Sequence, residues 1–210
     1  MARSIIALAS LKGGCGKSTL ALNLAAGLAL RNSVGLVDAD PQGALRHWAQ
    51  CAVGNGLPEV VAAGDDPLEA LSRSARRYHR VVVDCPPSLD MAITRQILQQ
   101  VDVVLIPVLP SPLDLWASAE TVEAVWQARE RNPSLKAWLL INQAEPSSAL
   151  SRAMSRALSG LDVPTLGCVV RRRAVFRMAA VEGLSVYQIG PRGRDAAREI
   201  DQVIEEVTRT

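Results

Sequence analysis

The stretch that decides the fold reads Lys12-Gly13-Gly14-Cys15-Gly16-Lys17-Ser18-Thr19. Only three of the 23 basic residues are lysines, and two of them lie in this glycine loop. Glycine lets backbone N–H groups close around an anion, and lysine adds a compact, flexible positive charge. An apolar run at 5–9 precedes the loop, and Leu20, Leu24 and Leu28 follow it at helical spacing. A strand, a glycine loop and a helix N-terminus in this order predict a phosphate-binding site.

The composition is typical of helices packed on a parallel sheet. A length of 210 residues allows a single domain, 1–210, with a sizeable core. Hydrophobic residues make up 49% of the chain and aromatic residues only 3%, so small aliphatic side chains must fill that core. The four cysteines lack metal-ligand spacing, and we find no leader and no membrane-spanning run, so we expect a cytoplasmic protein with reduced thiols. A net charge of +2 does not by itself indicate a polyanionic partner.

Apolar β-branched runs alternate with helical patterns along the whole chain. This alternation predicts an α/β fold with a mostly parallel, doubly wound sheet that is flanked by helices. The glycine-rich, polar segment 53–66 is the best candidate for a mobile loop. The predicted strands are 4–10, 34–38, 59–62, 80–84, 103–108, 137–142 and, more weakly, 166–170, and the predicted helices are 17–31, 42–52, 66–78, 91–100, 114–131, 147–159, 173–182 and 191–208.

Ligands of such sheets bind beyond the carboxyl ends of the strands, where this chain carries polar residues. Asp38 and Asp40 follow one predicted strand, Asp84 ends a second, and Asn142 ends a third. A triphosphate with Mg²⁺ needs carboxylates on the metal side. We expect Lys17 to reach the phosphates and the Ser18 hydroxyl to bind Mg²⁺.

The loop departs from the ordinary P-loop, because Leu11 stands where the first glycine should be. Its pattern instead resembles the deviant Walker A motif of the ParA/MinD family of ATPases. The resemblance implies a P-loop NTPase that uses ATP and Mg²⁺, with 13–19 around the phosphates. It also implies that Asp84 is the Walker B aspartate, which holds Mg²⁺ through water, and that Asn142 contacts adenine. Taken alone, Asp84 and Asn142 are also common turn formers.

The same resemblance assigns three catalytic residues. Lys12 would cross to the ATP of a second subunit and stabilise the charge of the transition state, much as an arginine finger does. Asp40 would position the hydrolytic water, and Asp38 would belong to the surrounding shell. The alternatives are a solvated surface lysine at position 12 and a helix-capping role for either aspartate.

Similarity to the partition ATPases extends along the chain, through 104–114, 173–176 and 182–186, and is greatest to the small ParA (ParF-like) proteins. It implies a homodimer that forms on ATP binding, coats nucleoid DNA without sequence preference and leaves when a ParB-like or other cargo adaptor stimulates hydrolysis. Plasmid or chromosome segregation is the first interpretation. The alternatives are positioning of a protein cargo, such as a carboxysome or chemoreceptor array, and MinD-like membrane positioning.

Two terminal features bear on these alternatives. Only eleven residues precede Lys12, so we expect no N-terminal helix-turn-helix that reads an operator. The C-terminal stripe of Ile200, Val203, Ile204 and Val207 is flanked by acids, so we expect it to pack on the domain, and we expect no membrane-targeting tail.

A basic cluster near the C-terminus is the candidate DNA contact. Nine arginines and three acids lie between Arg152 and Arg198. Such a patch would bind phosphates in a salt-sensitive, sequence-blind way. The alternative is a solvated, ion-paired helix face. The tightest cluster comprises Arg171, Arg172, Arg173 and Arg177.

Overall fold

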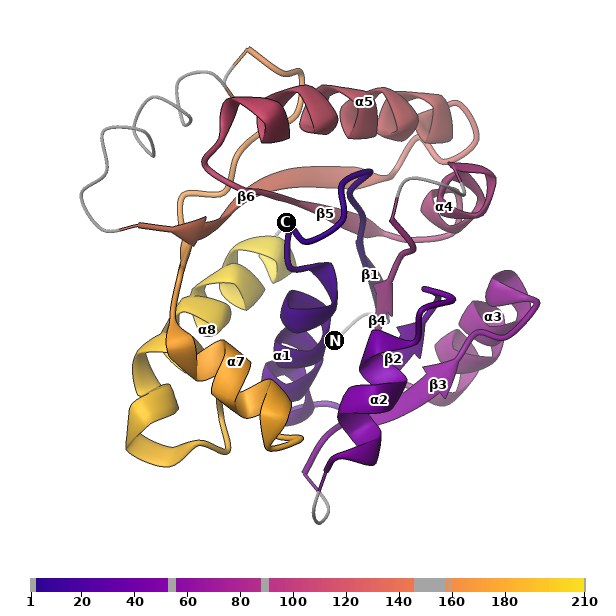
Figure 1. Cartoon of the computed structure of the whole chain (residues 1–210). Coiled ribbons are helices and arrows are strands. Elements are labelled where there is room, and N and C mark those ends of the chain that lie inside the picture. The colour runs from indigo at the N-terminus through magenta and orange to yellow at the C-terminus, as the bar shows by residue number, and fades with distance from the viewer. Residues whose placement is uncertain (1–2, 53–55, 88–90, 146–157, 159, 210) are drawn as a thin grey trace.

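A computed structural model describes residues 3–52, 56–87, 91–145, 158 and 160–209 (Figure 1). Its centre is a seven-stranded sheet of order β3-β2-β4-β1-β5-β6-β7, in which every pairing is parallel. The predicted parallel α/β fold is therefore confirmed. The strands are β1 (Ser4–Leu8), β2 (Val34–Asp38), β3 (Glu59–Ala62), β4 (Arg80–Asp84), β5 (Val103–Val108), β6 (Lys136–Ala144) and β7 (Val170–Arg171).

Helices cover both faces of the sheet and bury two separate apolar cores. Along β1 and the residue after it, Ile6 and Leu8 enter one core while Ala7 and Ala9 enter the other, because side chains alternate along a strand. The first core lies under α1 (Lys17–Ala29), α2 (Ala44–Gln50), α7 (Ala174–Val181) and α8 (Arg194–Thr208), and the second under α3 (Pro67–Arg77), α4 (Met91–Leu98) and α5 (Pro112–Arg129).

The C-terminal helix α8 packs against α1, as its apolar stripe predicts. Ile200 and Val203 are fully buried in the core that α1 also lines. Gly27 of α1 allows the close approach, since a Cβ there would meet Ile204 Cδ1 at 2.7 Å. This stripe therefore stabilises the domain and is not free to bind elsewhere.

The last strand is displaced from its predicted position at 166–170. Backbone N–H groups of Gly167 and Cys168 donate to the Glu206 carboxylate of α8 at 2.8 and 2.9 Å. These donors therefore do not pair with β6, and among the described residues an isolated bridge between Leu139 and Thr165 precedes β7. The predicted helix 147–159 falls outside the described residues except for Leu158, and residues 53–55 of the predicted loop fall outside them as well.

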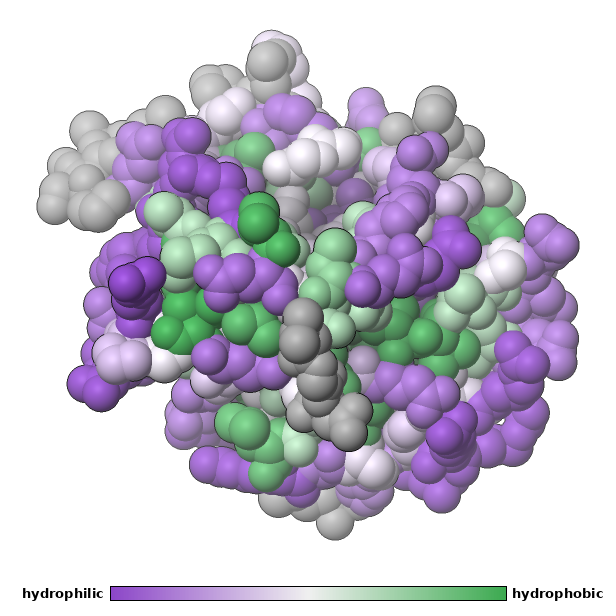
Figure 2. Space-filling view, turned by 60° about the horizontal axis from the view of Figure 1, so that its bottom comes forward, coloured by the Kyte–Doolittle hydropathy of each residue, from purple (hydrophilic) through white to green (hydrophobic). Residues whose placement is uncertain are grey.

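Hydrophobic residues on the outside occur in separate patches with hydrophilic residues between them, as the face in Figure 2 shows. Within the described ranges, no helix is both long enough and apolar enough to cross a membrane.

Candidate functional site

The glycine loop lies at the carboxyl edge of the sheet, between β1 and the start of α1. Gly14 and Gly16 have φ values of 78° and 92°, which other residues rarely adopt. Gly16 is restricted further, because a Cβ there would lie 2.5 Å from Asn142 Nδ2. Backbone and packing thus both require glycine at this position, and α1 begins at the next residue. The predicted order of strand, loop and helix is confirmed.

Lys17 lies beneath the loop and is only 6% exposed. Its ammonium donates to the carbonyl oxygens of Ser10 and Lys12, each at 3.3 Å. Two carbonyl dipoles satisfy hydrogen bonds but do not neutralise a buried charge. The position is therefore suited to an anion that the loop encloses.

Asp84 and Asp38 end neighbouring strands and are aligned in register. Asp84 is fully buried, and among the described residues no donor is in good hydrogen-bond geometry to either of its carboxylate oxygens, although the Ser18 hydroxyl and the Lys17 ammonium lie nearby. Burial raises the pKa of Asp84 to about 7, against the opposing effects of the nearby Ser18 hydroxyl and Lys17 ammonium. Burial also raises the pKa of Asp38, whose Oδ2 accepts from the Arg46 backbone N–H at 3.1 Å.

These groups fit a magnesium ion. Mg²⁺ prefers hard oxygen ligands, and carboxylate and hydroxyl oxygens meet that preference. A cation would also compensate the two uncompensated oxygens of Asp84, which cost free energy while they stay buried and unpaired. Ser18 and Asp84 are the residues that would hold it, directly or through water.

Asp40 differs from Asp38 in its surroundings. It is partly exposed, and its Oδ1 accepts from the Gln42 backbone N–H at 2.9 Å. This bond closes a turn before α2, which begins at Ala44, so Asp40 does not cap that helix. Asp40 is thus the aspartate nearer to solvent at the strand edge, whereas Asp38 is tied to α2 through Arg46.

Lys12 contacts a residue to which the sequence assigned no role. Its Nζ lies 2.7 Å from Oδ2 of Asp114, in the first turn of α5. The Lys12 side chain is 36% exposed and that of Asp114 only 4% exposed. This ion pair holds Lys12 at the rim of the loop. An acid at the start of the helix that follows β5 is the sequence signal that would have found Asp114.

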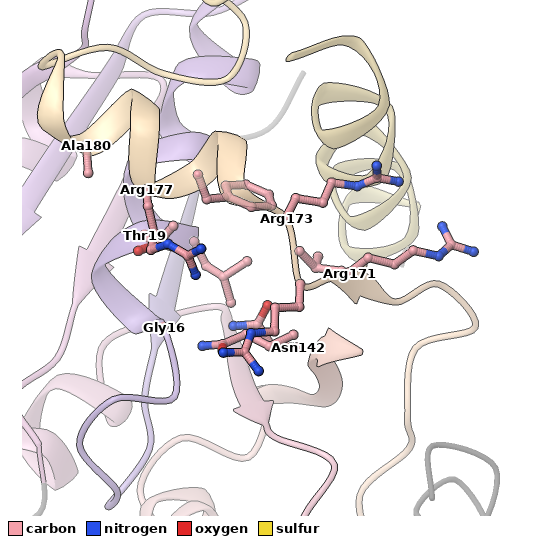
Figure 3. A pocket seen from close by; sticks show the side chains of 12 residues that line it. Gly16, Thr19, Asn142, Arg171, Arg173, Arg177 and Ala180 are labelled. Carbon is pink, nitrogen blue, oxygen red and sulfur yellow. The ribbon is translucent and has the colours of Figure 1, made fainter. Parts of the chain in front are cut away.

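A pocket of about 190 Å³ adjoins the loop on the side of β6 and α7 (Figure 3). Asn142 Nδ2 donates to the carbonyl oxygen of Cys15 at 2.7 Å and so connects the pocket to the loop. In Figure 3, Arg177 is directed toward Thr19 and the pocket, whereas Arg171 and Arg173 extend away from it. All four arginines of the predicted DNA contact line this pocket, but the side chains of Arg171 and Arg173 point away from that of Arg177.

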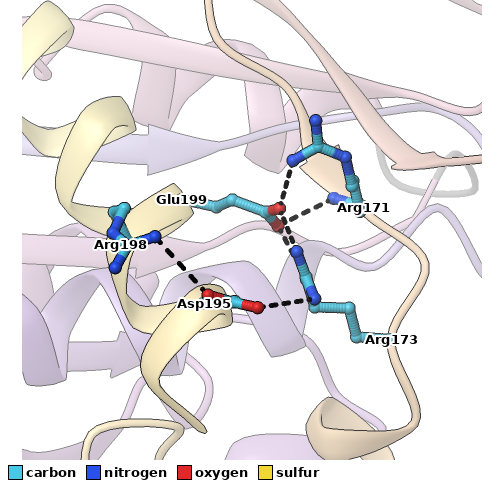
Figure 4. A network of polar contacts seen from close by, with 5 residues as sticks. All are labelled: Arg171, Arg173, Asp195, Arg198 and Glu199. Atoms are coloured by element: carbon cyan, nitrogen blue, oxygen red, sulfur yellow. Dashed lines mark hydrogen bonds and ion pairs between the residues drawn. The ribbon is translucent and has the colours of Figure 1, made fainter. Parts of the chain in front are cut away.

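Three of those arginines are in ion pairs, and Figure 4 shows the pairs of Arg171 and Arg173. Arg171 and Arg173 both bind Glu199, at 2.8 and 2.7 Å, and Arg172 lies 3.5 Å from Glu145. Burial alone would raise the pKa of Glu199, but hydrogen bonds from Arg173 and Arg171 outweigh it and lower that pKa. The ion-paired alternative describes these three residues, and DNA contact by them stays a prediction.

Residues 6–186 match the family model CbiA, which describes the CobQ/CobB/MinD/ParA nucleotide-binding domain. The chain belongs to this family. Its members include a relative from Halothiobacillus neapolitanus named maintenance of carboxysome distribution protein A. That relative is 54% identical over 205 residues, which cover 96% of this chain and 95% of the relative.

Solved structures of the family share the fold at lower identity. An aspartate-to-alanine variant of McdA from Cyanothece, in complex with ATP, has a TM-score of 0.68 and 17% identity, with 98% of this chain and 96% of that one covered. Cobyrinic acid a,c-diamide synthase from Mycobacterium smegmatis, with bound ADP and magnesium, has a TM-score of 0.72 and 20% identity, with coverages of 99% and 96%. Because one of these proteins is a synthase, the fold alone does not decide the reaction.

Proposed function

We propose that this protein is an ATPase that hydrolyses ATP to ADP and phosphate and thereby positions carboxysomes. The observation that carries the proposal is the 54% identity, over nearly the full length of both chains, to a protein named for carboxysome distribution. The site supports the ATPase part, because its buried lysine and uncompensated carboxylate suit a magnesium-bound phosphate chain.

ATP would bind with its phosphates in the loop 13–19 and its base in the pocket beside Asn142. Lys17 neutralises phosphate charge, and the N-terminus of α1 adds its dipole. Bound Mg²⁺ supplies positive charge at the phosphate oxygens, with Ser18 and Asp84 as its protein ligands or their water-linked partners. Asp40, the more accessible aspartate, orients the attacking water, and Asp38 fixes the start of α2 beside it.

Lys12 acts on a second subunit in this proposal. ATP binding brings two copies together face to face, and each Lys12 leaves Asp114 to stabilise charge on the nucleotide of its partner. The 2.7 Å ion pair with Asp114 keeps Lys12 at the rim until then. We expect Lys12→Ala to keep nucleotide binding and to lose stimulated hydrolysis and dimerisation.

The proposed cargo differs from the first interpretation of the sequence. The sequence favours plasmid or chromosome segregation over a protein cargo, whereas the named relative favours the protein cargo. MinD-like membrane binding has little support, because the apolar stripe of α8 is buried against α1. Binding to nucleoid DNA remains part of the proposal. The ATP-bound dimer binds this DNA without sequence preference, and a cargo-bound adaptor releases the dimer from it.

The test combines a biochemical and a cellular measurement. ATP turnover and DNA retention are measured with ATP and with ADP at several salt concentrations, with Lys12→Ala as the comparison. Carboxysome positions are then imaged in cells that lack the gene and in cells that carry it again. We expect ATP-dependent retention and clustered carboxysomes in the deletion strain. Evenly spaced carboxysomes in that strain contradict the cargo, and absent ATP turnover contradicts the enzyme.

A further inference from the structure

Two exposed tryptophans distinguish the outer side of α5. The chain has four tryptophans, two tyrosines and one phenylalanine in 210 residues. Trp116 and Trp126 are nevertheless 67% and 43% exposed. Tryptophan is the residue type most enriched at the energetic centres of protein interfaces, and a protein poor in aromatic residues would otherwise bury it. This placement points to a surface that a partner covers.

Acidic residues lie between and beside these tryptophans. Because residues three or four apart share one side of a helix, Trp116, Glu120, Glu123, Trp126 and Glu130 form a single exposed row, which we call the α5 outer stripe. Its three glutamates make no ion pair within the described ranges. The opposite side of α5, with Val122 and Val125, is buried against the sheet.

One ring of the stripe already accepts a guanidinium group. Arg129 Cζ lies 4.7 Å from the centre of the Trp126 ring. Such cation–π contacts are strongest with tryptophan and are strengthened by nearby carboxylates. Among the described residues no cation lies over Trp116. The chemistry of the stripe therefore fits a segment that carries arginine or lysine.

The inner side of the same helix is bonded to the phosphate loop. Asp114 holds Lys12 at 2.7 Å, and Thr121 Oγ1 accepts from the Leu11 backbone N–H at 3.2 Å. A partner on the outer stripe thus sits on the helix that positions Lys12. Binding that moves α5 by a small amount would alter the hold of Asp114 on Lys12.

We propose that the α5 outer stripe docks a cationic segment of the cargo-bound adaptor, with Trp116 as its main anchor. The choice of the adaptor rests on the proposed function. A second copy of this chain fits less well, because two residues of its densest arginine run, Arg171 and Arg173, are held in ion pairs with Glu199. An adaptor that binds here reaches Lys12 through one helix.

The test uses a labelled, helical, arginine-rich peptide as the probe, with a glutamate-rich peptide of equal length as its control. Affinity is measured by fluorescence anisotropy for the wild type, Trp116→Ala, Glu120→Lys with Glu123→Lys, and Val181→Ala. Val181 is 82% exposed on α7 and serves as the matched apolar control. We expect binding of the arginine-rich peptide alone, weakened at least tenfold by the first two changes and unchanged by Val181→Ala.

Equal affinity in all variants, or equal binding of the glutamate-rich peptide, overturns the proposal. So does loss of ATP-dependent dimerisation in Trp116→Ala, since the stripe would then belong to an interface between copies. Unchanged ATP binding and thermal unfolding of the variants verify their fold. The peptide assay needs neither hydrolysis nor cargo. Peptide binding can therefore be observed even if the proposed function is wrong, and it can be absent even if the proposed function is right.

Discussion

The phosphate loop and the C-terminal arginine cluster differ in how far their charged side chains are compensated by partners within the chain. At the loop, within the described ranges, Lys17 donates hydrogen bonds to carbonyl oxygens alone and makes no ion pair, and the oxygens of Asp84 lack hydrogen-bond partners, although both side chains are buried. In the cluster, Arg171 and Arg173 share Glu199, and Arg173 also contacts Asp195, so each guanidinium already has an acidic partner. Groups that are buried and left uncompensated mark a binding site, whereas groups that are compensated within the chain contribute to stability. Density of charge in the sequence does not separate these two cases.

The largest effect is expected from Lys17→Ala, which removes the cation beneath the loop. Loss of a charge-assisted contact to phosphate should weaken ATP binding by more than about 100-fold, equivalent to about 3 kcal/mol. Isothermal titration calorimetry with ATP and magnesium measures it. Lys136→Ala, which removes the third lysine, is the control and should leave affinity unchanged. Unaltered ATP affinity in Lys17→Ala would refute the site.

Asp84→Asn should change stability in a pH-dependent way. The pKa of Asp84 is raised in the folded protein, so the folded state binds more protons than the unfolded one between pH 4 and 7, and wild-type stability falls as pH rises through this range. The cost amounts to at most about 4 kcal/mol. Asp84→Asn should abolish this decline and also weaken magnesium-dependent ATP binding.

Thermal unfolding from pH 4 to pH 8, without nucleotide, tests this expectation. Asp162→Asn, at an exposed position, should unfold with the wild-type pH profile. A decline in stability that persists in Asp84→Asn would mean that another group carries the raised pKa.

Glu199→Gln should break the compensation in the arginine cluster. Because the pKa of Glu199 is lowered, its contribution to stability is present above about pH 4.5 and is lost as pH falls further. We expect a loss of about 2 kcal/mol at pH 7. Arg171 would lose its ion pair and Arg173 would keep the contact with Asp195 at 3.6 Å, so DNA retention should rise and its salt dependence should steepen. Glu205→Gln, on the exposed side of α8, is the control. Unchanged DNA retention in Glu199→Gln would show that Arg171 and Arg173 do not face DNA.

The smallest effect is expected from Arg172→Ala. Arg172 and Glu145 are 60% and 62% exposed and 3.5 Å apart, so their pair should contribute less than about 0.5 kcal/mol. Arg172 is thus the arginine of the run most available to DNA. If it contacts a phosphate, the salt slope of DNA retention should fall by about one. An identical slope would show that Arg172 does not contact a phosphate.

Local patterns in the sequence predicted most of the fold and the loop. Four strand ranges, including 34–38 and 80–84, agree with the structure because buried parallel strands read as continuous apolar runs. The displaced β7 was not predictable locally, since it depends on Glu206, which lies 39 residues after Gly167. The partners of the charged groups are also distant in the chain. Asp114 lies 102 residues from Lys12, and Glu199 lies 28 residues from Arg171.

The hydrogen bond between Asn142 and the Cys15 carbonyl joins two ends of the pocket that are 127 residues apart in the chain. Anything that orders the glycine loop also orders the amide of Asn142, and the reverse holds. Adenosine and inorganic triphosphate, supplied as separate molecules, should therefore each raise the affinity for the other, because the molecule that binds first orders the binding site of the second. Recognition of the whole nucleotide then exceeds the sum of its fragments.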